Sequence, residues 1–297
     1  MRNMTPEGKN CIEGYVPVPG GPVWYRIAGA GKKGVPLLVL HGGPGTPHDY
    51  LEPLEVLADD RPVIFYDQLG CGNSGHPGDT SLWRVERFVE ELHAVRSFLA
   101  LERLYLLGQS WGTMLAVRYL FSPAAAGVAG LVLSGPFLSA SRWIADQRAW
   151  LAEMPEDIRR AVREAEATGD FDNPSYAGAM AAFYSEHLCR LDPWPDCLNR
   201  SFEKMSMPVY LTMWGPSEFT CTGLLKDAEA ADLLGDISVP TLFTCGRYDE
   251  ARPETTAYYQ GLVPGSRMAV FENASHEHHL EQPNGYLAAV REFLRPE

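Results

Sequence analysis

The chain has 297 residues, of which 45% are hydrophobic, and this suits one large domain or a domain that carries an insert. Its formal net charge is −13 at pH 7, and no cluster of Lys and Arg occurs, so we expect no nucleic-acid partner. No run of about 18 uninterrupted apolar residues is present, which predicts that the protein does not span a membrane.

The beginning of the chain and its cysteines indicate where the protein works. Residues 1–21 are polar, rich in Gly and Pro, and lack the apolar segment of a secretory signal. The six cysteines form no CxxC pair and are interpreted as free thiols of a reducing compartment, with a Cys189–Cys197 disulfide as the alternative. These features predict a cytoplasmic protein.

Six short apolar runs predict strands that are buried on both faces. They cover residues 37–40, 63–66, 104–107, 131–133, 241–244 and 268–271. Continuous apolar runs are typical of a parallel sheet covered by helices. Helical patterns lie between them, over residues 83–99 and 111–121, with apolar residues at steps of three and four. The alternation predicts a doubly wound α/β sheet of the α/β-hydrolase type.

One segment interrupts this alternation. Residues 137–236 contain no comparable strand run but show helical patterns at 144–151 and 157–168. A segment of about a hundred residues is too long for a plain loop. We expect a core made of residues 1–136 and 237–297, and a mostly helical cap made of residues 137–236 over the C-terminal edge of the sheet.

The sequence GQSWG at residues 108–112 predicts a nucleophile elbow. It lies between a predicted strand and a predicted helix, which is the context that the G-x-S-x-G motif requires. Small residues two positions before and after the serine relieve crowding in this strained turn. Ser110 is therefore the candidate nucleophile, and the alternative is a glycine-rich turn with an incidental serine.

A serine nucleophile needs a base, and in this fold class the base follows the acid in the chain. His276, His278 and His279 all follow the last predicted strand. His276 is favoured because it lies nearest the strand end, whereas His278 and His279 fall where a helix or a polar surface is expected. His41 precedes Ser110 and does not fit this order.

The acid is expected in the loop after residues 241–244, which holds Asp249 and Glu250. We favour Asp249, with Glu250 as the alternative, because the loop can aim only one of them at the imidazole. The loop after residues 131–133 has no acid until Asp146. The acid would hold the histidine tautomer and stabilise the imidazolium.

The sequence HGGPG at residues 41–45 predicts the oxyanion hole. The loop after this strand supplies one N–H in α/β hydrolases, and the residue after the nucleophile supplies the other. These positions are Gly43 and Trp111. A phosphate-binding loop is disfavoured, because neither a following Lys nor a GxGxxG spacing is present.

Together, HGGPG at 41–45, YDQLGCGNS at 66–74 and GQSWG at 108–112 resemble the proline iminopeptidase family. These enzymes are serine aminopeptidases of the α/β-hydrolase superfamily. Within the family, the chain is most similar to the tricorn-interacting-factor type of prolyl aminopeptidase and to related amino-acid amidases. WGPSEFT at 214–220 and GRYDE at 246–250 extend the similarity, which runs from about Cys11 to the end of the chain.

The resemblance implies roles for several residues. It implies the triad Ser110, Asp249 and His276. It also implies that Glu218 and Glu250 bind the free α-ammonium of the substrate; the alternatives are a solvated cap residue and a surface neighbour of Asp249. Asp67 is interpreted as a structural hydrogen-bonding group. Six aromatic residues of the insert line an apolar pocket or form the cap's own core: Phe183, Tyr184, Trp194, Tyr210, Trp214 and Phe219.

We therefore expect an aminopeptidase or amidase that releases an N-terminal amino acid, proline or another small or apolar residue, from short peptides or amino-acid amides. The reaction passes through an acyl-enzyme on Ser110 and needs no metal or organic cofactor. The alternative is a carboxylesterase or amidase that acts on non-peptide substrates with the same triad. Epoxide hydrolases and haloalkane dehalogenases need an Asp nucleophile, which Ser110 argues against.

Overall fold

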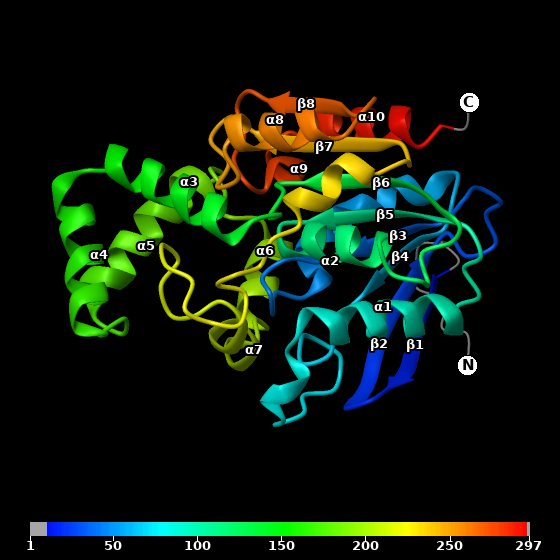
Figure 1. Cartoon of the computed structure of the whole chain (residues 1–297), viewed down its shortest axis with the longest axis horizontal. Helices are drawn as coiled ribbons and strands as arrows, with labels where there is room; N and C mark the ends of the chain where they lie inside the picture. The colour runs from blue at the N-terminus through cyan, green and yellow to red at the C-terminus, as the bar shows by residue number, and fades with distance from the viewer. Residues whose placement is uncertain (1–10, 296–297) are drawn as a thin grey trace.

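The computed structural model describes residues 11–295, which form an eight-stranded sheet in the order β1-β2-β4-β3-β5-β6-β7-β8 (Figure 1). Strands β3 to β8 run parallel to one another, whereas β2 pairs antiparallel with both β1 and β4. The strands are β1 (Cys11–Val18), β2 (Gly21–Ala28), β3 (Leu37–Leu40), β4 (Val63–Tyr66), β5 (Leu104–Gln109), β6 (Val128–Ser134), β7 (Thr241–Gly246) and β8 (Arg267–Phe271). All six predicted strands are present, four of them longer than their apolar runs.

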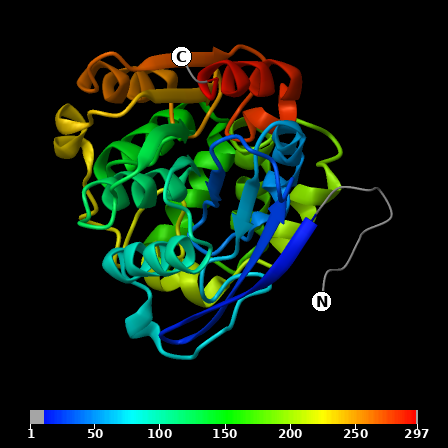
Figure 2. The same ribbon diagram turned by 90° about the vertical axis from the view of Figure 1, so that its right-hand side faces the viewer.

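The hairpin of β1 and β2 was not predicted from the sequence. It forms one edge of the sheet, and β8 forms the opposite edge (Figure 2). Val16 and Val23 are buried, but most β1 side chains are partly or fully exposed. A strand with Gly and Pro and with few buried positions lacks the continuous apolar run that identifies the central strands.

Helices cover both faces of the sheet, as predicted. Leu38 and Leu40 of β3 pack on the face that holds α1 (Val85–Phe98), α2 (Trp111–Leu120) and α8 (Pro253–Leu262). Leu37 and Val39 point to the other face, which holds the 3₁₀ helix η1 (His48–Asp59) and α10 (Pro283–Phe293). The alternation of side chains along each strand therefore divides the apolar core into two layers. Phe98, the last residue of α1, is exposed although it is one of the apolar residues of the helical pattern predicted over residues 83–99.

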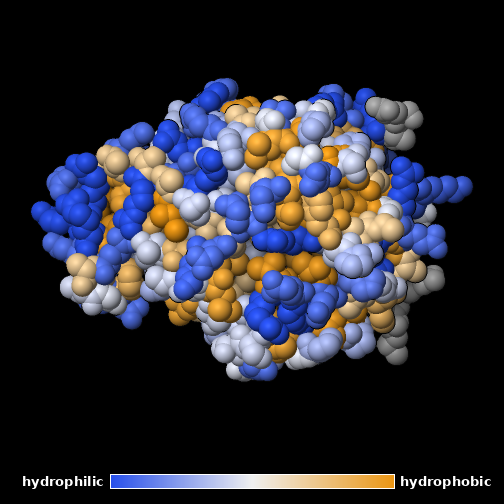
Figure 3. Space-filling model, viewed as in Figure 1, coloured by the Kyte–Doolittle hydropathy of each residue, from blue (hydrophilic) through white to orange (hydrophobic). Residues whose placement is uncertain are grey.

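Five α-helices and one 3₁₀ helix occupy the segment between β6 and β7: α3 (Ala140–Glu153), α4 (Glu156–Thr168), α5 (Pro174–His187), α6 (Asp196–Glu203), α7 (Met207–Met213) and η3 (Ala231–Asp236). In Figure 1, α3 to α5 lie beyond the end of the sheet at which β6 stops. Val162 and Phe183 belong to a small apolar core of this segment's own. Hydrophilic side chains gather over α4 at its far end (Figure 3). Two isolated bridges are the nearest approach to a strand here within residues 11–295.

Two further features follow from the described part of the chain. No helix within residues 11–295 has the length and apolar character that a membrane crossing requires. The six cysteines are all free thiols, so the alternative of a Cys189–Cys197 disulfide is wrong.

The close contact between α2 and β3 depends on a glycine. A Cβ atom at Gly112 would lie 2.1 Å from the carbonyl oxygen of Leu40. Gly178, in the middle of α5, is exposed, and a Cβ atom placed there would meet no atom within 4 Å. A side chain is therefore excluded at Gly112 and can be accommodated at Gly178.

We expect Gly112→Ala to lower the free energy of unfolding by about 1–3 kcal/mol, because the backbone of β3 cannot move away from the new methyl group. Gly178→Ala should raise it by about 0.5–1 kcal/mol, because alanine loses less backbone entropy in a helix. Urea unfolding followed by circular dichroism measures both. Equal stabilities of the two variants would contradict the packing role of Gly112.

Candidate active site

Ser110 occupies a strained turn between β5 and α2. Its backbone has φ 53° and ψ −121°, a conformation that residues other than glycine rarely adopt. Gly108 and Gly112 make this turn possible, since a Cβ atom on Gly108 would lie 2.3 Å from the carbonyl oxygen of Gly112. The amide of Ser110 donates to the carbonyl of Ser134 at 2.9 Å, which ties the turn to β6. The predicted nucleophile elbow is therefore formed.

Asp249 and His276 are joined by a hydrogen bond of 2.7 Å between Oδ1 and Nδ1. Asp249 is fully buried, and it also accepts the N–H groups of Gly246 and Ala251. Burial alone would raise the pKa of Asp249, but His276 and His278 lower it well below its usual range. Nδ1 of His276 therefore carries the hydrogen, and Nε2 is left for other chemistry.

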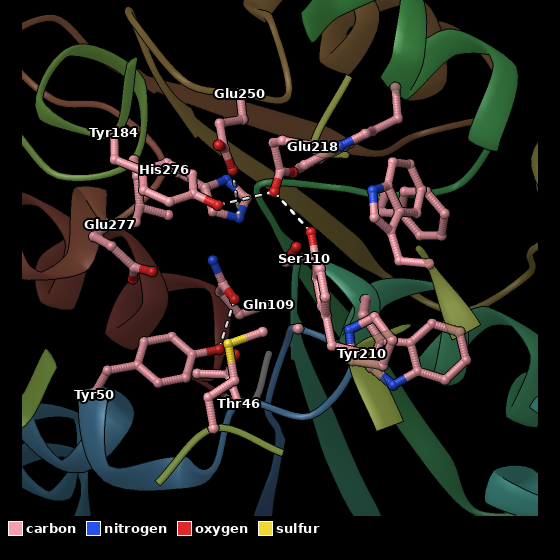
Figure 4. Close-up of a pocket in the computed structure, with 18 of the residues that line it drawn as sticks. Thr46, Tyr50, Gln109, Ser110, Tyr184, Tyr210, Glu218, Glu250, His276 and Glu277 are labelled. Carbon is pink, nitrogen blue, oxygen red and sulfur yellow. Dashed lines mark hydrogen bonds and ion pairs between the residues drawn. The ribbon is translucent and has the colours of Figure 1, made fainter. Parts of the chain in front are cut away.

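Ser110 and His276 line the same cavity. Figure 4 shows the side chains around it. Within residues 11–295, no hydrogen bond joins the Ser110 hydroxyl to the imidazole. Such catalytic hydrogen bonds are often long before substrate binds. The structure thus brings the predicted nucleophile, base and acid together from three separate loops.

Gly43 and Trp111 line the same cavity. Trp111 is the first residue of α2, so its N–H is among those that have no partner inside the helix. The neighbouring amide of Gly42 is already engaged, because it donates to the Tyr50 hydroxyl at 2.8 Å. The two residues predicted to form the oxyanion hole therefore both border the cavity that holds Ser110.

Hydrogen bonds connect the loops that carry the first three motifs. The backbone N–H of Gln68 donates to His41 Nε2 at 2.9 Å. The side-chain oxygen Oε1 of Gln68 accepts a hydrogen bond from the Trp111 indole at 2.9 Å. Asp67 accepts hydrogen bonds from His48 and Asn73. The structural interpretation of Asp67 is confirmed, and Gln68 links the oxyanion loop to the nucleophile elbow.

Glu218 reaches the cavity from the insert. Its Oε2 accepts hydrogen bonds from the hydroxyls of Tyr184, at 2.9 Å, and Tyr210, at 2.8 Å (Figure 4). Burial raises the pKa of Glu218, although these hydroxyls and His276 oppose the shift. The alternative of a solvated cap residue is therefore wrong.

Glu250 follows the triad acid directly in the chain, and its side chain is buried. Its Oε2 is 4.0 Å from His276 Nε2, and its Oε1 has no hydrogen-bond partner. Burial raises the pKa of Glu250 strongly, and the negative charge of Glu218 and Asp249 adds to the shift. Glu250 is thus a cavity residue rather than a surface neighbour of Asp249.

The sequence reasoning missed Glu277, which follows His276 directly. Its side chain is buried and lines the cavity, and burial raises its pKa to about 8. The sequence offered one indication of a role for Glu277, its position next to the candidate base His276. The polar residues around it are typical of an exposed surface and favoured the opposite interpretation.

Of the two expectations for His278 and His279, the helix is confirmed, because both lie in the short helix α9 (His278–Glu281), and the polar surface is wrong, because both are buried. His278 Nε2 contacts the hydroxyls of Ser134 and Thr244, and His279 Nε2 contacts the carbonyl of Tyr50. These imidazoles act as internal hydrogen-bonding groups. No cluster of three or more His, Cys, Asp and Glu suited to a metal occurs within residues 11–295.

Some of the aromatic residues of the insert line the cavity, and others pack into the hydrophobic core, so each of the two predicted roles is found. Tyr184, Tyr210 and Trp214 line the cavity, together with Phe137 and Trp143 from the start of the insert. Phe183 and Phe219 belong to the insert's own core, and Trp194 packs beside the core layer that holds η1. The cavity is therefore lined by aromatic rings and by carboxylates, and the Tyr184 and Tyr210 hydroxyls contact Glu218 directly.

Comparison with known proteins assigns this arrangement to a family. The family model described as "alpha/beta hydrolase fold" matches residues 35–283. A proline iminopeptidase of Heyndrickxia coagulans is 43% identical over 283 residues, covering 95% of this chain and 98% of the relative. A proline iminopeptidase of Saccharolobus solfataricus is 36% identical, covering 96% and 93%.

Solved structures agree with these sequence comparisons. The crystal structure of a proline iminopeptidase from Mycobacterium smegmatis matches with a TM-score of 0.87 at 36% identity, covering 95% of this chain and 97% of that chain. The crystal structure of VinJ matches with a TM-score of 0.90 at 37% identity, covering 95% and 98%. An esterase from Exiguobacterium antarcticum, at 20% identity and a TM-score of 0.70, shares the fold.

The carboxylates around His276 produce a testable electrostatic effect. Burial lowers the pKa of His276, but Asp249, Glu250 and Glu277 together raise it above its ordinary value. We expect Glu250→Gln to lower the pKa of the His276 imidazole, because the variant removes a negative charge that favours the protonated ring. NMR titration of the ring measures the change. Glu272→Gln, at an exposed carboxylate paired with Arg247, is the matched control, and an equal shift in both variants would contradict the assignment.

Proposed function

Because the chain belongs to the proline iminopeptidase family of α/β hydrolases, we propose that it is a serine aminopeptidase that releases N-terminal proline from short peptides or amino-acid amides. One observation carries the proposal most directly: Glu218 and Glu250 lie in the same cavity as Ser110 and His276. A carboxylate that is largely removed from water is costly unless a cation pairs with it, and a free amino terminus would supply that cation beside Ser110.

In the proposed reaction, Ser110 Oγ attacks the carbonyl carbon of the N-terminal residue while His276 Nε2 takes its proton. The N–H groups of Gly43 and Trp111 hold the developing oxyanion. His276 then gives the proton to the departing nitrogen, and the C–N bond breaks. Water, deprotonated by the same imidazole, hydrolyses the acyl-enzyme and frees Ser110.

The two glutamates are proposed to select the free amino terminus. The ring nitrogen of an N-terminal proline carries two hydrogens when protonated, which matches one donor for each carboxylate. The hydroxyls of Tyr184 and Tyr210 hold Glu218 in place. The apolar walls formed by Phe137, Trp143 and Trp214 suit the methylene groups of the proline ring.

Substrate binding also tunes the base in this proposal. The carboxylate charge that raises the pKa of His276 is offset once an ammonium lies between Glu218 and Glu250. The imidazole then gives up its proton more readily, so it is ready to act as a base when an amine-bearing substrate is present. An amine-free ester does not provide this compensation.

A division of labour along the chain is part of the proposal. Residues 1–136 and 237–297 would form the catalytic core, and residues 137–236 would form a cap that supplies Glu218 and closes the cavity against long chains. We also propose that the protein works in the cytoplasm, and its six free thiols support this location.

Replacing the nucleophile tests the chemistry. We expect Ser110→Ala to lower kcat for proline naphthylamide by about 10⁴-fold or more, because no other group supplies the attacking oxygen. A fluorophosphonate probe should label the wild-type protein at Ser110 and leave the variant unlabelled. Thermal unfolding checks that the variant is folded, and retained turnover by a folded variant would refute the acyl-enzyme mechanism.

Blocking the substrate amine separates an aminopeptidase from an esterase or amidase of non-peptide substrates. We expect N-acetylation of proline amide to lower kcat/KM by about 30-fold or more, or about 2 kcal/mol, because the buried carboxylates lose their cation. Glu218→Gln and Glu250→Gln should weaken the free amine more than the blocked one. Glu203→Gln, an exposed residue of α6, is the control. Equal turnover of free and blocked substrates by the wild type would favour the esterase alternative.

A further inference from the structure

Glu277 is a buried carboxylate that the proposed reaction does not use. It is 4% exposed, it lines the cavity, and its Oε2 has no hydrogen-bond partner. Figure 4 shows its carboxylate pointing into the cavity. A buried charge without a partner is costly, so it is neutralised by a proton or by a cation from a ligand.

The closest titratable neighbour does not neutralise Glu277. His279 Nδ1 lies 3.5 Å from Glu277 Oε2. Since His279 Nε2 contacts the carbonyl oxygen of Tyr50, its hydrogen resides on Nε2 and Nδ1 is a lone pair. Burial also lowers the pKa of His279 to about 3, which keeps the ring neutral. Two acceptors therefore face one another.

Nearby donors are committed elsewhere or make no contact with Glu277. The Tyr50 hydroxyl accepts from the Gly42 amide, and it donates its own hydrogen to Gln109 Oε1 at 2.6 Å. The side-chain nitrogen Nε2 of Gln109 has no hydrogen-bond partner, so it does not donate a hydrogen bond to the Glu277 carboxylate. Among the described residues that line the cavity, none is Lys or Arg. No Lys or Arg of the lining offsets the negative charge of Glu277 when it is ionised, so a cationic ligand is the group that would pair with it.

The position of Glu277 indicates which part of the ligand supplies that charge. In Figure 4, Glu218 and Glu250 lie on one side of the His276 ring, and Glu277 lies on another side, toward Tyr50. His276 must protonate the departing nitrogen, so the departing group lies beside this ring. Glu218 and Glu250 are already assigned to the amino terminus.

We propose that Glu277 binds a cationic side chain on the departing part of the substrate, so that the enzyme prefers substrates with lysine or arginine after the N-terminal proline. This proposal rests on the proposed function, because the sides of the cavity are assigned from that reaction. The overall charge of −13 attracts such doubly positive substrates.

The test compares two dipeptide amides, prolyl-lysine amide and prolyl-norleucine amide. Norleucine keeps the carbon chain of lysine and lacks its charge, and the C-terminal amide removes a carboxylate that the cavity would repel. We expect wild-type kcat/KM to be about tenfold or more higher for the lysine substrate. Glu277→Gln and Glu277→Met should bring the ratio close to one, whereas Glu203→Gln should keep the wild-type ratio.

The pH dependence of that ratio supplies a second readout. The titratable groups that face Glu277 are His276, the neutral His279, Asp249, Glu250 and Glu281. Because burial raises the pKa of Glu277 to about 8, the ratio should rise from about pH 6 to about pH 9 as the carboxylate ionises, while lysine stays charged. The ratio should not change with pH in Glu277→Gln.

The outcomes distinguish the two proposals. If neither dipeptide amide is cleaved at the proline bond, the proposed function is wrong. If both are cleaved with equal kcat/KM by the wild type, or if the ratio survives in Glu277→Gln, the proposed function stands and the role of Glu277 is overturned.

Discussion

The hydrogen bond between Asp249 and His276 is the interaction on which the candidate site depends. Asp249 has no exposed surface, yet the N–H groups of Gly246 and Ala251 and the ring of His276 satisfy its oxygens. This environment keeps the carboxylate ionised, and the ionised carboxylate fixes the imidazole tautomer. Asp249, in the short loop after β7, therefore determines that Nδ1 of the His276 ring is bonded and that Nε2 is free.

Around that pair, the cavity carries more negative charge than a serine hydrolase needs. Glu218, Glu250 and Glu277 are enclosed with a single imidazole, and burial raises the pKa of all three. Removing a carboxylate from water is unfavourable unless a cation joins it, and this cost is the main cause of the three raised pKa values. In the proposed function, the ammonium group of the substrate supplies the missing cation.

Much of the architecture was predictable from the sequence because buried parallel strands have continuous apolar runs. The nucleophile and its partners were predictable for a different reason: each follows a strand at the same edge of one sheet. The β1–β2 hairpin escaped prediction because an edge strand has few buried side chains. Glu277, His278 and His279 also escaped, because the segment that buries them is distant in sequence. The amides of His276 and Glu277 donate to the carbonyls of His187 and Leu188, at the end of α5.

The pairing of Glu218 with Tyr184 and Tyr210 has an evolutionary consequence. All three residues belong to the segment between β6 and β7, and they contribute no atom to the Ser110–His276–Asp249 arrangement. If Glu218 binds the substrate amine as proposed, mutations in α5 or α7 can change which amine is bound while Ser110, His276 and Asp249 stay in place. Divergence within such a lineage is expected to concentrate in these helices, so that a new preference arises by drift in one inserted segment and not by rebuilding the scaffold.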